Sequence, residues 1–332
     1  LYSPGSTIKP IVALSALENN IIDKNFKVNC TGKIEMYGQK YHCWKKKGHG
    51  VVNLKSAMKQ SCDVYFYEIA RKLGVDRLKE TATKFGLGEK VLQETFSGEK
   101  KGLIPNTQWK KDNLGKGWVI GETLITGIGQ GYMQTTPLQL CLMTAQLANG
   151  GYKIYPRITV NENDDTHEEI KLLIEKNKKI KNNLIVTSDG LFKFDKKQKH
   201  EPLYEKFENI RLIQEAMFSS TNEIRGTSYS SRIDNPKYQF AGKTGTSQVK
   251  RITEKQRELN LKTMDIPYND RDHALFVAFG PYKNPRYALS VVVEHGGSGS
   301  STAAPIAKKL FKLILDRHEV RDKIRKKKIV KI

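Results

Sequence analysis

The sequence predicts an α+β fold, in which helices cover an antiparallel sheet and a helical subdomain lies beside it. Three observations carry this prediction: an apolar helical run at 11–17, helical periodicity through the middle of the chain, and three strand-like segments near its end. The last two of these segments are joined by a short Gly-Pro connection, which is typical of an antiparallel hairpin. With 332 residues, the chain can bury a substantial core.

The first third of the chain is predicted to hold a helix, a hairpin and a second, interrupted helix. Residues 28–47 have the pattern of two short strands around a turn at Gly38. Apolar spacing predicts a helix over 54–73, with an interruption near 61–63 and Gly74 as its end. Residues 94–118 contain several Gly and a Pro and are predicted to be a loop.

A glycine-rich bend at 127–131 precedes a well-marked helix. Thr136 is the expected N-cap of this helix, Pro137 its first residue and 149–151 its stop. Such a bend is also found in phosphate-binding loops, but no Lys-Ser/Thr pair follows it and no strand of a βαβ unit precedes it. A nucleotide site is therefore not predicted.

The remainder of the chain is predicted to contain a variable region and then the sheet. Residues 161–205 are polar and Lys-rich, which indicates a surface insertion. The elements expected after it are a helix at 209–222, strands at 238–242, 274–279 and 287–294, a closing helix at 302–318 and a basic tail at 321–332.

The charge of the chain is strongly basic. Its 57 Lys+Arg against 35 Asp+Glu give a net charge of +22. Two interpretations remain open: an AT-rich genome that places lysines on solvated faces, or attraction to an anionic surface such as a phospholipid leaflet. Nucleic acid is not indicated, because no basic module interleaved with aromatics is recognisable. No apolar run approaches about 18 residues, so no segment is predicted to span a membrane.

The first candidate for chemistry is the pair Ser6 and Lys9. They stand one helical turn apart after the Pro4-Gly5 turn, so their side chains are expected on one face of the first helix. The unpaired N–H groups and the positive dipole end of a helix start favour negative charge on an attacking oxygen. A desolvated amine can take a hydroxyl proton, so Ser6 is the candidate nucleophile and Lys9 its general base.

A second motif, Ser61-Cys62-Asp63, falls at the predicted helix interruption. The Ser61 hydroxyl is expected to relay a proton there, and Asp63 is expected to contact the substrate. Taken alone, such a serine is better explained as a helix cap.

The third motif, Lys243-Thr244-Gly245-Thr246, is predicted at the end of a strand. Lys243 and the hydroxyls of Thr244 and Thr246 suit a substrate carboxylate, and Gly245 is expected to let the backbone approach the substrate closely. The backbone N–H of Thr246, together with that of Ser6, is expected to form an oxyanion hole.

The three motifs, in this order, are those of β-lactamases and penicillin-binding proteins. The chain resembles the transpeptidase domain of class B penicillin-binding proteins, of the penicillin-binding protein 2 (elongation, rod-shape) type. The resemblance covers nearly the whole chain except about 160–205. Beyond the three motifs it rests on 98–105, 121–123, 128–131 with 136–139, 273–279 and 303–305.

This resemblance implies the penicillin-binding-protein/serine β-lactamase-like fold over a catalytic domain at 1–320. It also implies cross-linking of peptidoglycan: Ser6 attacks the penultimate D-Ala of one stem peptide, expels D-Ala and passes the acyl group to an amine of a neighbouring stem. β-Lactams are then expected to inhibit the enzyme, and a membrane glycan polymerase of the elongation machinery is its expected partner.

The chain lacks an initial Met and opens on the proposed nucleophile motif. We therefore expect it to be a fragment, with a membrane anchor and a pedestal domain upstream. The expected location is the periplasmic face of the inner membrane. Two departures from the family pattern stand out: Asp63 where many relatives have Asn, and Ser247 where Ala is common.

Two other functions fit the same motifs. A β-lactamase or a β-lactam sensor shares them, although no second carboxylate motif that would position water for deacylation is evident after Ser61. A non-catalytic scaffold that binds cell-wall peptides or partner proteins is the alternative from another class.

Three of the four cysteines and one histidine form a second pattern: Cys30, Cys43, His49 and Cys62. Three thiolates and one imidazole make a closed tetrahedral set for one structural zinc ion, which would pin the hairpin to the Ser61 segment. Some relatives resemble this arrangement, with an Asp at one or more of the Cys positions. His42 is the alternative histidine.

A disulfide between Cys30 and Cys43 is the competing prediction, because the expected compartment is oxidising. It would leave Cys62 unpaired. Cys141 lies on the apolar face of a predicted helix and is expected to be ordinary core.

Overall fold

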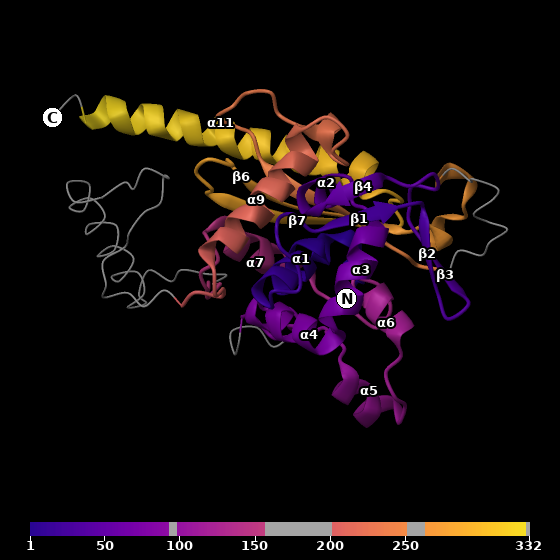
Figure 1. Cartoon of the computed structure of the whole chain (residues 1–332). Helices are drawn as coiled ribbons and strands as arrows, with labels where there is room; N and C mark the ends of the chain where they lie inside the picture. Colours follow the sequence, from indigo (N-terminus) through magenta and orange to yellow (C-terminus); the bar gives the residue numbers. More distant parts are fainter. Residues whose placement is uncertain (93–97, 157–200, 251–262, 330–332) are drawn as a thin grey trace.

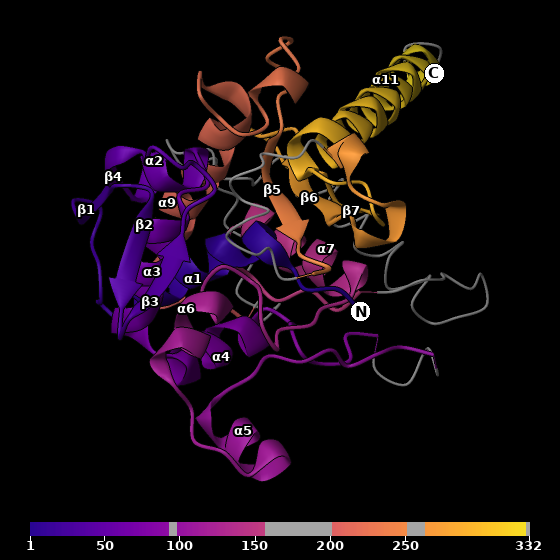
Figure 2. The ribbon, with the colours of Figure 1, turned by 90° about the vertical axis from the view of Figure 1, so that its right-hand side faces the viewer.

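The computed structural model describes residues 1–92, 98–156, 201–250 and 263–329, with side chains up to 320. Most of the predicted insertion at 161–205 lies outside these ranges, as do the last residues of the predicted tail. In the described part of the chain, helices cover both faces of an antiparallel sheet (Figures 1 and 2), so the predicted α+β class is confirmed. None of the helices described here is long and apolar enough to cross a lipid bilayer.

The central sheet has three strands. They are β5 (Ala241–Ser247), β6 (His273–Gly280) and β7 (Tyr287–Val293), in that order and antiparallel throughout. The middle strand, β6, is apolar along most of its length because both its faces are covered. Leu275 and Val277 belong to the large core, whereas Ala274 and Phe276 belong to a smaller one on the opposite face.

The smaller core is closed by α11 (Ala304–Ile329), which follows a π-helical turn at Gly299–Ala303. Its side chains Ala307 and Phe311 pack on the sheet. The far part of α11 extends away from the body of the molecule (Figure 1). The helix continues through most of the predicted tail, because no Gly or Pro interrupts this run of Lys, Arg and Ile.

The large core lies on the other face of the sheet. It is covered by α1 (Lys9–Glu18), α7 (Pro137–Ala148) and α9 (Phe207–Asn222). Helix α1 is buried from Lys9 to Leu17, as a helix that is apolar on all sides should be. The predicted start of α7 is confirmed: Thr136 accepts a hydrogen bond from the Gln139 N–H, and the Gln139 side chain accepts one from the Thr136 N–H.

The hairpin and the remaining helices lie on the side of the molecule away from the central sheet (Figure 2) and contribute to the same large core. The strands of this part pair as β1 (Lys27–Cys30) with β4 (Gly50–Asn53) and as β2 (Lys33–Met36) with β3 (Gln39–His42). Its helices are α2 (Leu54–Lys59), α3 (Asp63–Leu73), α4 (Val75–Lys84), α5 (Thr107–Leu114) and α6 (Ile120–Thr126). The predicted hairpin is confirmed as β2–β3. Tyr37 and Gly38 both have positive φ at its turn, as a type I′ turn requires.

Two predictions of secondary structure are wrong. Helix α5 lies inside the predicted loop at 94–118, where the Asn106 side chain caps it and Gly115 ends it in the left-handed conformation. The first sheet strand begins at Ala241 and not at 238. Lys243 to Thr246 therefore lie within β5, because pairing with β6 overrides the weak strand preference of a Gly-rich segment.

Candidate active site

Ser6 lies in a 3₁₀ turn at Gly5–Ile8, which we call the Ser6 turn, directly before α1. It was expected in the first turn of the helix and stands just ahead of it. Ser6 is half-buried, whereas the Thr7 side chain is fully buried. The glycine-rich bend anchors this turn, because the Gly5 N–H donates to the Gly129 carbonyl at 2.9 Å. The glycine-rich bend at 127–131 thus helps to fix the position of Ser6.

Strand β5 packs directly against the Ser6 turn. A Cβ atom on Gly245 would lie only 2.7 Å from Cγ2 of Thr7 and 3.0 Å from the Pro4 carbonyl oxygen. Glycine is therefore needed here so that the two segments can meet. The close approach to substrate that the sequence suggested for Gly245 stays a prediction. The Gln130 side chain adds a second tie, since its Nε2 donates to the Thr246 carbonyl at 2.9 Å.

The Ser61 hydroxyl lies between two lysine amines. Its Oγ is 3.2 Å from Lys9 Nζ and 2.9 Å from Lys243 Nζ, and both lysines are fully buried. Ser61 connects α2 to α3 with a φ of +53°, in the left-handed region that serine rarely adopts. Strained backbone of this kind is concentrated at functional sites. The structure thus brings together one group from each motif: the Lys9 amine from the first, the Ser61 hydroxyl from the second and the Lys243 amine from the third.

Asp63 pairs with Lys9 at the base of this group. Lys9 Nζ lies 2.7 Å from Asp63 Oδ1, and the other carboxylate oxygen accepts the Trp44 backbone N–H at 2.9 Å. Because the protein engages both oxygens, Asp63 compensates the buried Lys9 charge in this structure. The expected contact of Asp63 with the substrate is not visible in this arrangement.

The two lysines differ in their electrostatic surroundings. Burial lowers the pKa of Lys243 well below its ordinary value, the nearby Lys9 lowers it further, and Asp63 opposes this shift. A neutral amine is therefore favoured at Lys243, hydrogen-bonded to the Ser61 hydroxyl. A neutral amine in this position can accept a proton.

The relation between Ser6 and Lys9 is less direct than their spacing suggests. Within the described residues, no hydrogen bond joins the Ser6 hydroxyl to the Lys9 amine. Lys9 instead donates to Asp63 and to the hydroxyl and carbonyl oxygens of Ser61. A buried ammonium needs such partners, because an unpaired charge in the interior is strongly destabilising.

Thr244 of the third motif contacts Thr227, a residue that the sequence analysis did not identify. The Thr244 hydroxyl donates to that of Thr227 at 2.9 Å, and the Thr227 N–H donates to the Lys59 carbonyl at 3.1 Å. Thr227 carries no motif, so only the folded structure reveals it. Thr246 is half-buried beside the Ser6 turn. The sequence could have pointed to Gln130, since it lies in the bend at 127–131.

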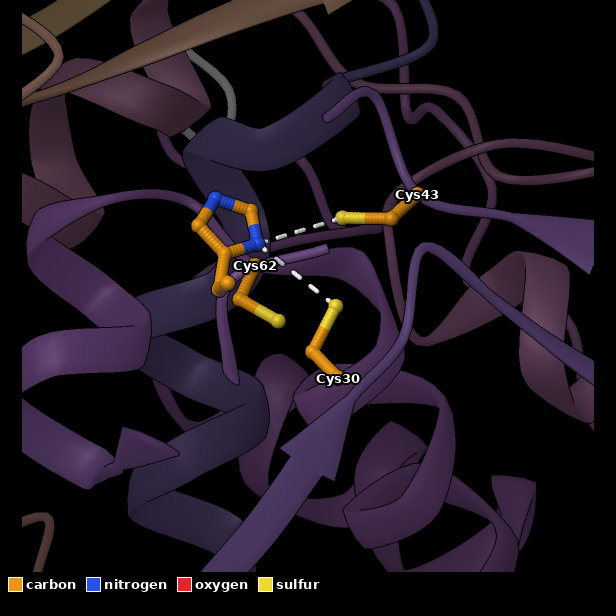
Figure 3. Close-up of side chains that lie close together, drawn as sticks. Cys30, Cys43 and Cys62 are labelled. Carbon is orange, nitrogen blue, oxygen red and sulfur yellow. Dashed lines mark hydrogen bonds between the residues drawn. The ribbon is translucent and has the colours of Figure 1, made fainter. Parts of the chain in front are cut away.

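The four predicted metal ligands meet at one point. Cys30 ends β1, Cys43 follows β3, His49 precedes β4, and Cys62 is the residue before α3. Their ligand atoms all lie within 4.8 Å of one another, and the three thiols converge (Figure 3). His49, and not the alternative His42, belongs to this cluster.

The geometry of the cluster fits a tetrahedral zinc ion. Zn–S and Zn–N bonds of about 2.3 and 2.05 Å at a tetrahedral angle put sulfur and nitrogen about 3.6 Å apart. The His49 Nδ1 lies 3.6 Å from Cys30 Sγ and 3.5 Å from Cys43 Sγ. All four cysteines are in the described ranges and all are free thiols, so the alternative Cys30–Cys43 disulfide is not formed in this structure.

The thiols also share their protons unequally. The pKa of Cys43 lies below its ordinary value, chiefly because Cys62 donates a hydrogen bond to it, and that bond raises the pKa of Cys62. The cluster therefore already favours one thiolate, the form that binds metal. Cys141, outside the cluster, lies on α7, and its Sγ contacts the Ala288 carbonyl at 3.5 Å. Burial raises the pKa of this thiol.

The cluster is joined to the group of Lys9, Ser61 and Lys243 through neighbours in sequence. Cys62 stands between Ser61 and Asp63, and Cys43 precedes Trp44. The Trp44 backbone holds Asp63, and its indole N–H donates to the Ser61 carbonyl at 3.1 Å. A change at the cluster is therefore expected to reach Ser61.

Comparison with known proteins agrees with the three motifs. The family model described as penicillin binding protein transpeptidase domain matches residues 1–312. The chain is 35% identical over 318 residues to the peptidoglycan D,D-transpeptidase MrdA of Salmonella typhimurium, covering 95% of the chain and 47% of that protein. It is 34% identical over 313 residues to MrdA of Acinetobacter baumannii, covering 94% of the chain and 42% of that protein. The chain thus spans less than half the length of these relatives.

Solved structures give the same result for the fold. Pseudomonas aeruginosa PBP2 in complex with WCK 5153 has a TM-score of 0.73 and 36% identity, with coverage of 95% of the chain and 61% of that structure. Helicobacter pylori PBP2 in complex with MreC has a TM-score of 0.74 and 30% identity, with coverage of 95% and 50%.

Proposed function

The chain belongs to the penicillin-binding protein transpeptidase family, and on this premise we propose that it cross-links peptidoglycan as a D,D-transpeptidase. The observation that carries the proposal is the Ser61 hydroxyl between the amines of Lys9 and Lys243, beside a Ser6 turn held on β5. The substrate is a stem peptide that ends in D-Ala-D-Ala.

Acylation begins when the Ser6 Oγ attacks the carbonyl carbon of the penultimate D-Ala. The new ester bond forms, the peptide C–N bond breaks, and terminal D-Ala leaves with a proton. An amine of a second stem peptide then attacks the ester, forms the cross-link and frees the Ser6 hydroxyl. The N–H groups of Ser6 and Thr246 stabilise the oxyanion in both steps, and Lys243, Thr244 and Thr246 bind the substrate carboxylate.

The buried network supplies the base. Lys9 is held as an ammonium by Asp63, whereas burial favours neutral Lys243. A proton that moves from Lys9 to the Ser61 oxygen, while the Ser61 proton moves to Lys243, leaves Lys9 neutral. Lys9 then accepts the Ser6 proton as the general base, and Ser61 is the relay.

We further propose that this chemistry serves lateral elongation of the cell wall at the periplasmic face of the inner membrane. The relatives named peptidoglycan D,D-transpeptidase MrdA support the cross-linking chemistry on which this placement depends. A glycan polymerase of the same machinery is the proposed partner, since cross-linking needs new glycan strands. The solved complex of the Helicobacter pylori relative with MreC supports assembly with other proteins.

The cluster of Cys30, Cys43, His49 and Cys62 is proposed to hold one structural zinc ion. All four positions of the tetrahedron come from the protein, so the ion stabilises the fold and has no open position for water. Its role is to fix the segments that carry Trp44 and Cys62, and through them Ser61. Metal analysis of purified protein should give one zinc per chain, and a metal-free protein with a Cys30–Cys43 bridge would contradict this assignment.

The transpeptidase proposal is tested with a fluorescent penicillin and mass spectrometry. The wild-type protein should carry one penicilloyl adduct on Ser6, and the S6A variant should carry none while it unfolds at the same temperature. A long-lived adduct supports a transpeptidase, whereas rapid clearance with turnover of penicillin would make the protein a β-lactamase. A well-folded wild type without an adduct would leave only the scaffold alternative.

A further inference from the structure

His273 occupies the first position of β6, opposite Ser247 at the end of β5. Its Nδ1 accepts the backbone N–H of His295 at 3.0 Å. A backbone N–H is always a donor, so Nδ1 carries no proton in this structure and the neutral ring holds its proton on Nε2. The His273 side chain thereby connects the start of β6 to the turn that follows β7, residues 294–299.

This turn is a strained segment. His295 has a φ of +55°, the left-handed region that is uncommon for residues other than glycine. Two more hydrogen bonds hold it: the Gly297 N–H donates to the Asp272 carbonyl at 2.8 Å, and His295 Nδ1 donates to the Arg271 carbonyl at 3.1 Å. Strained backbone persists only where its surroundings hold it, so the His273 contact matters for its position.

The far side of the turn touches the third motif. Gly299 lies so close to the Gly245 backbone that no Cβ atom would fit between them. The near side touches the segment that leads to Ser6. Glu294, directly before His295, accepts a hydrogen bond from the Tyr2 hydroxyl at 2.7 Å, and the Tyr2 ring packs edge-on against His273 at 5.6 Å. The turn after β7 thus contacts both the segment that leads to Ser6, through Tyr2, and strand β5, through Gly245.

Protonation of His273 would break this connection. The imidazolium carries N–H groups on both nitrogens, so Nδ1–H would then face the N–H donor of His295. The titratable groups that face His273 are Tyr2 before the Ser6 turn, Glu294 at the end of β7, and His295, whose ring centroid lies 4.8 Å away. Tyr268 packs on the other side of His295, and Arg271 and Asp272 precede His273 in the chain.

These surroundings favour the neutral ring. Burial lowers the pKa of His273, the neighbouring His295 lowers it further, and Glu294 partly opposes the shift. With a pKa below that of the unfolded chain, His273 stabilises the fold above the ordinary histidine range. This contribution is lost as the pH falls through the lowered pKa.

We propose that His273 is a positioning residue for acylation, which in its neutral form holds the turn after β7 against Tyr2 and Gly245 and on protonation releases it. The proposal rests on the proposed acylation of Ser6. It assigns to the enzyme an acid sensor outside the Lys9–Ser61–Lys243 group. The expected consequence is slower acylation in acid, without a change in the catalytic residues themselves.

The test compares wild type with H273N, because an Asn carbonyl oxygen can accept the His295 N–H but does not titrate. The second-order rate of labelling by fluorescent penicillin is measured from pH 8 to pH 5. The H273N rate should match wild type within about threefold at pH 8. Because the protonated fraction of His273 grows as the pH falls below the ordinary histidine range, the ratio of the H273N rate to the wild-type rate should rise from pH 8 toward pH 5. H273F, which offers no acceptor, should be slow at every pH.

The control is H318Q on α11, where His318 contacts the Tyr287 hydroxyl away from this turn. Its rate ratio to wild type should not depend on pH. A ratio for H273N that stays constant from pH 8 to pH 5 would overturn the proposal. The unfolding temperature gives a readout without acylation: it should fall more steeply in acid for wild type than for H273N. Equal slopes would reject the His273 contact itself, whereas absence of labelling in folded wild type would reject the proposed function.

Discussion

Lys9 and Asp63 form an ion pair with 2.7 Å between Nζ and Oδ1, in which Lys9 is fully buried and the Asp63 side chain is 11% exposed. A buried pair of this kind contributes little net stability, but loss of one partner leaves an uncompensated charge in the interior. In this structure Asp63 therefore serves as the counter-ion of the buried Lys9 amine.

The first prediction concerns the removal of this carboxylate. D63A should lower the free energy of unfolding by about 3–5 kcal/mol, because the Lys9 ammonium would remain buried without its counter-ion. D63N, which keeps the shape and one acceptor oxygen, should cost less. Urea unfolding at neutral pH measures both. If D63A proves as stable as wild type, the Lys9 amine is neutral and the proton path proposed above needs revision.

The second prediction separates stability from chemistry at Lys243. K243M replaces a buried amine by an apolar side chain of similar length. It removes the desolvation cost of the amine and also its hydrogen bonds to Ser61 and to the Thr244 carbonyl, so the variant should stay close to wild type in stability at pH 7. Its acylation by penicillin should fall by about 10²–10⁴-fold, because the Ser61 hydroxyl loses its neutral acceptor. A K243M protein that is labelled at the wild-type rate would remove Lys243 from the proton path.

The lowered pKa of Lys243 also predicts the pH dependence of stability. An unfolded lysine keeps its proton up to about pH 10.4, whereas folded Lys243 releases its proton at a lower pH. Between these two values the unfolded state binds more protons, so the free energy of unfolding rises with pH. K243M should lose this slope. Urea unfolding from pH 6 to pH 9 measures it, and parallel curves for the two proteins would mean that Lys243 is charged when folded.

The sequence predicted the residues of the site better than their contacts. Ser6, Lys9, Ser61 and Lys243 were singled out because their motifs carry chemical groups at fixed spacings, and their catalytic roles stay predictions. Spacing alone placed Lys9 beside Ser6, whereas in the structure it turns toward Asp63. This choice depends on a chain segment more than fifty residues away, which no local pattern contains.

The same difference between local signals and contacts of distant segments applies to the fold. The helix α7 was located to the residue because its cap and its stop are local signals. The start of β5 was misplaced because this strand owes its existence to pairing with β6 and to packing on the Ser6 turn. Thr227 and the His273–His295 contact were missed for the same reason, since they join segments that are distant in sequence.

The next prediction tests whether the cysteine cluster supports the catalytic group. C43S should lose the zinc ion that we propose for the cluster. It should lower the free energy of unfolding by more than the roughly 0.5–3 kcal/mol of most substitutions, because loss of a metal is among the mechanisms with large effects. Acylation of Ser6 should slow as well, because Trp44 follows Cys43 and holds Asp63.

The matched control for C43S is C141S, the same substitution at the cysteine outside the cluster. It should keep one zinc per chain and the wild-type labelling rate. If a chelator removes the metal from wild type and neither the unfolding temperature nor the labelling rate changes, the cluster has no support function.

The last prediction concerns the contact between β5 and the Ser6 turn. G245A introduces a Cβ that would lie 2.7 Å from Thr7 Cγ2, closer than carbon atoms approach in folded proteins. The turn must therefore move away from the strand, which displaces Ser6 from the Thr246 N–H of the proposed oxyanion hole. Loss of one oxyanion-hole donor typically costs about 10²–10³ in rate, so penicillin labelling should slow to that extent. G117A is the control, since a Cβ at Gly117 meets nothing within 4 Å. A G245A protein that is labelled as fast as G117A would show that the turn tolerates the displacement, and that the position of Ser6 does not depend on this contact.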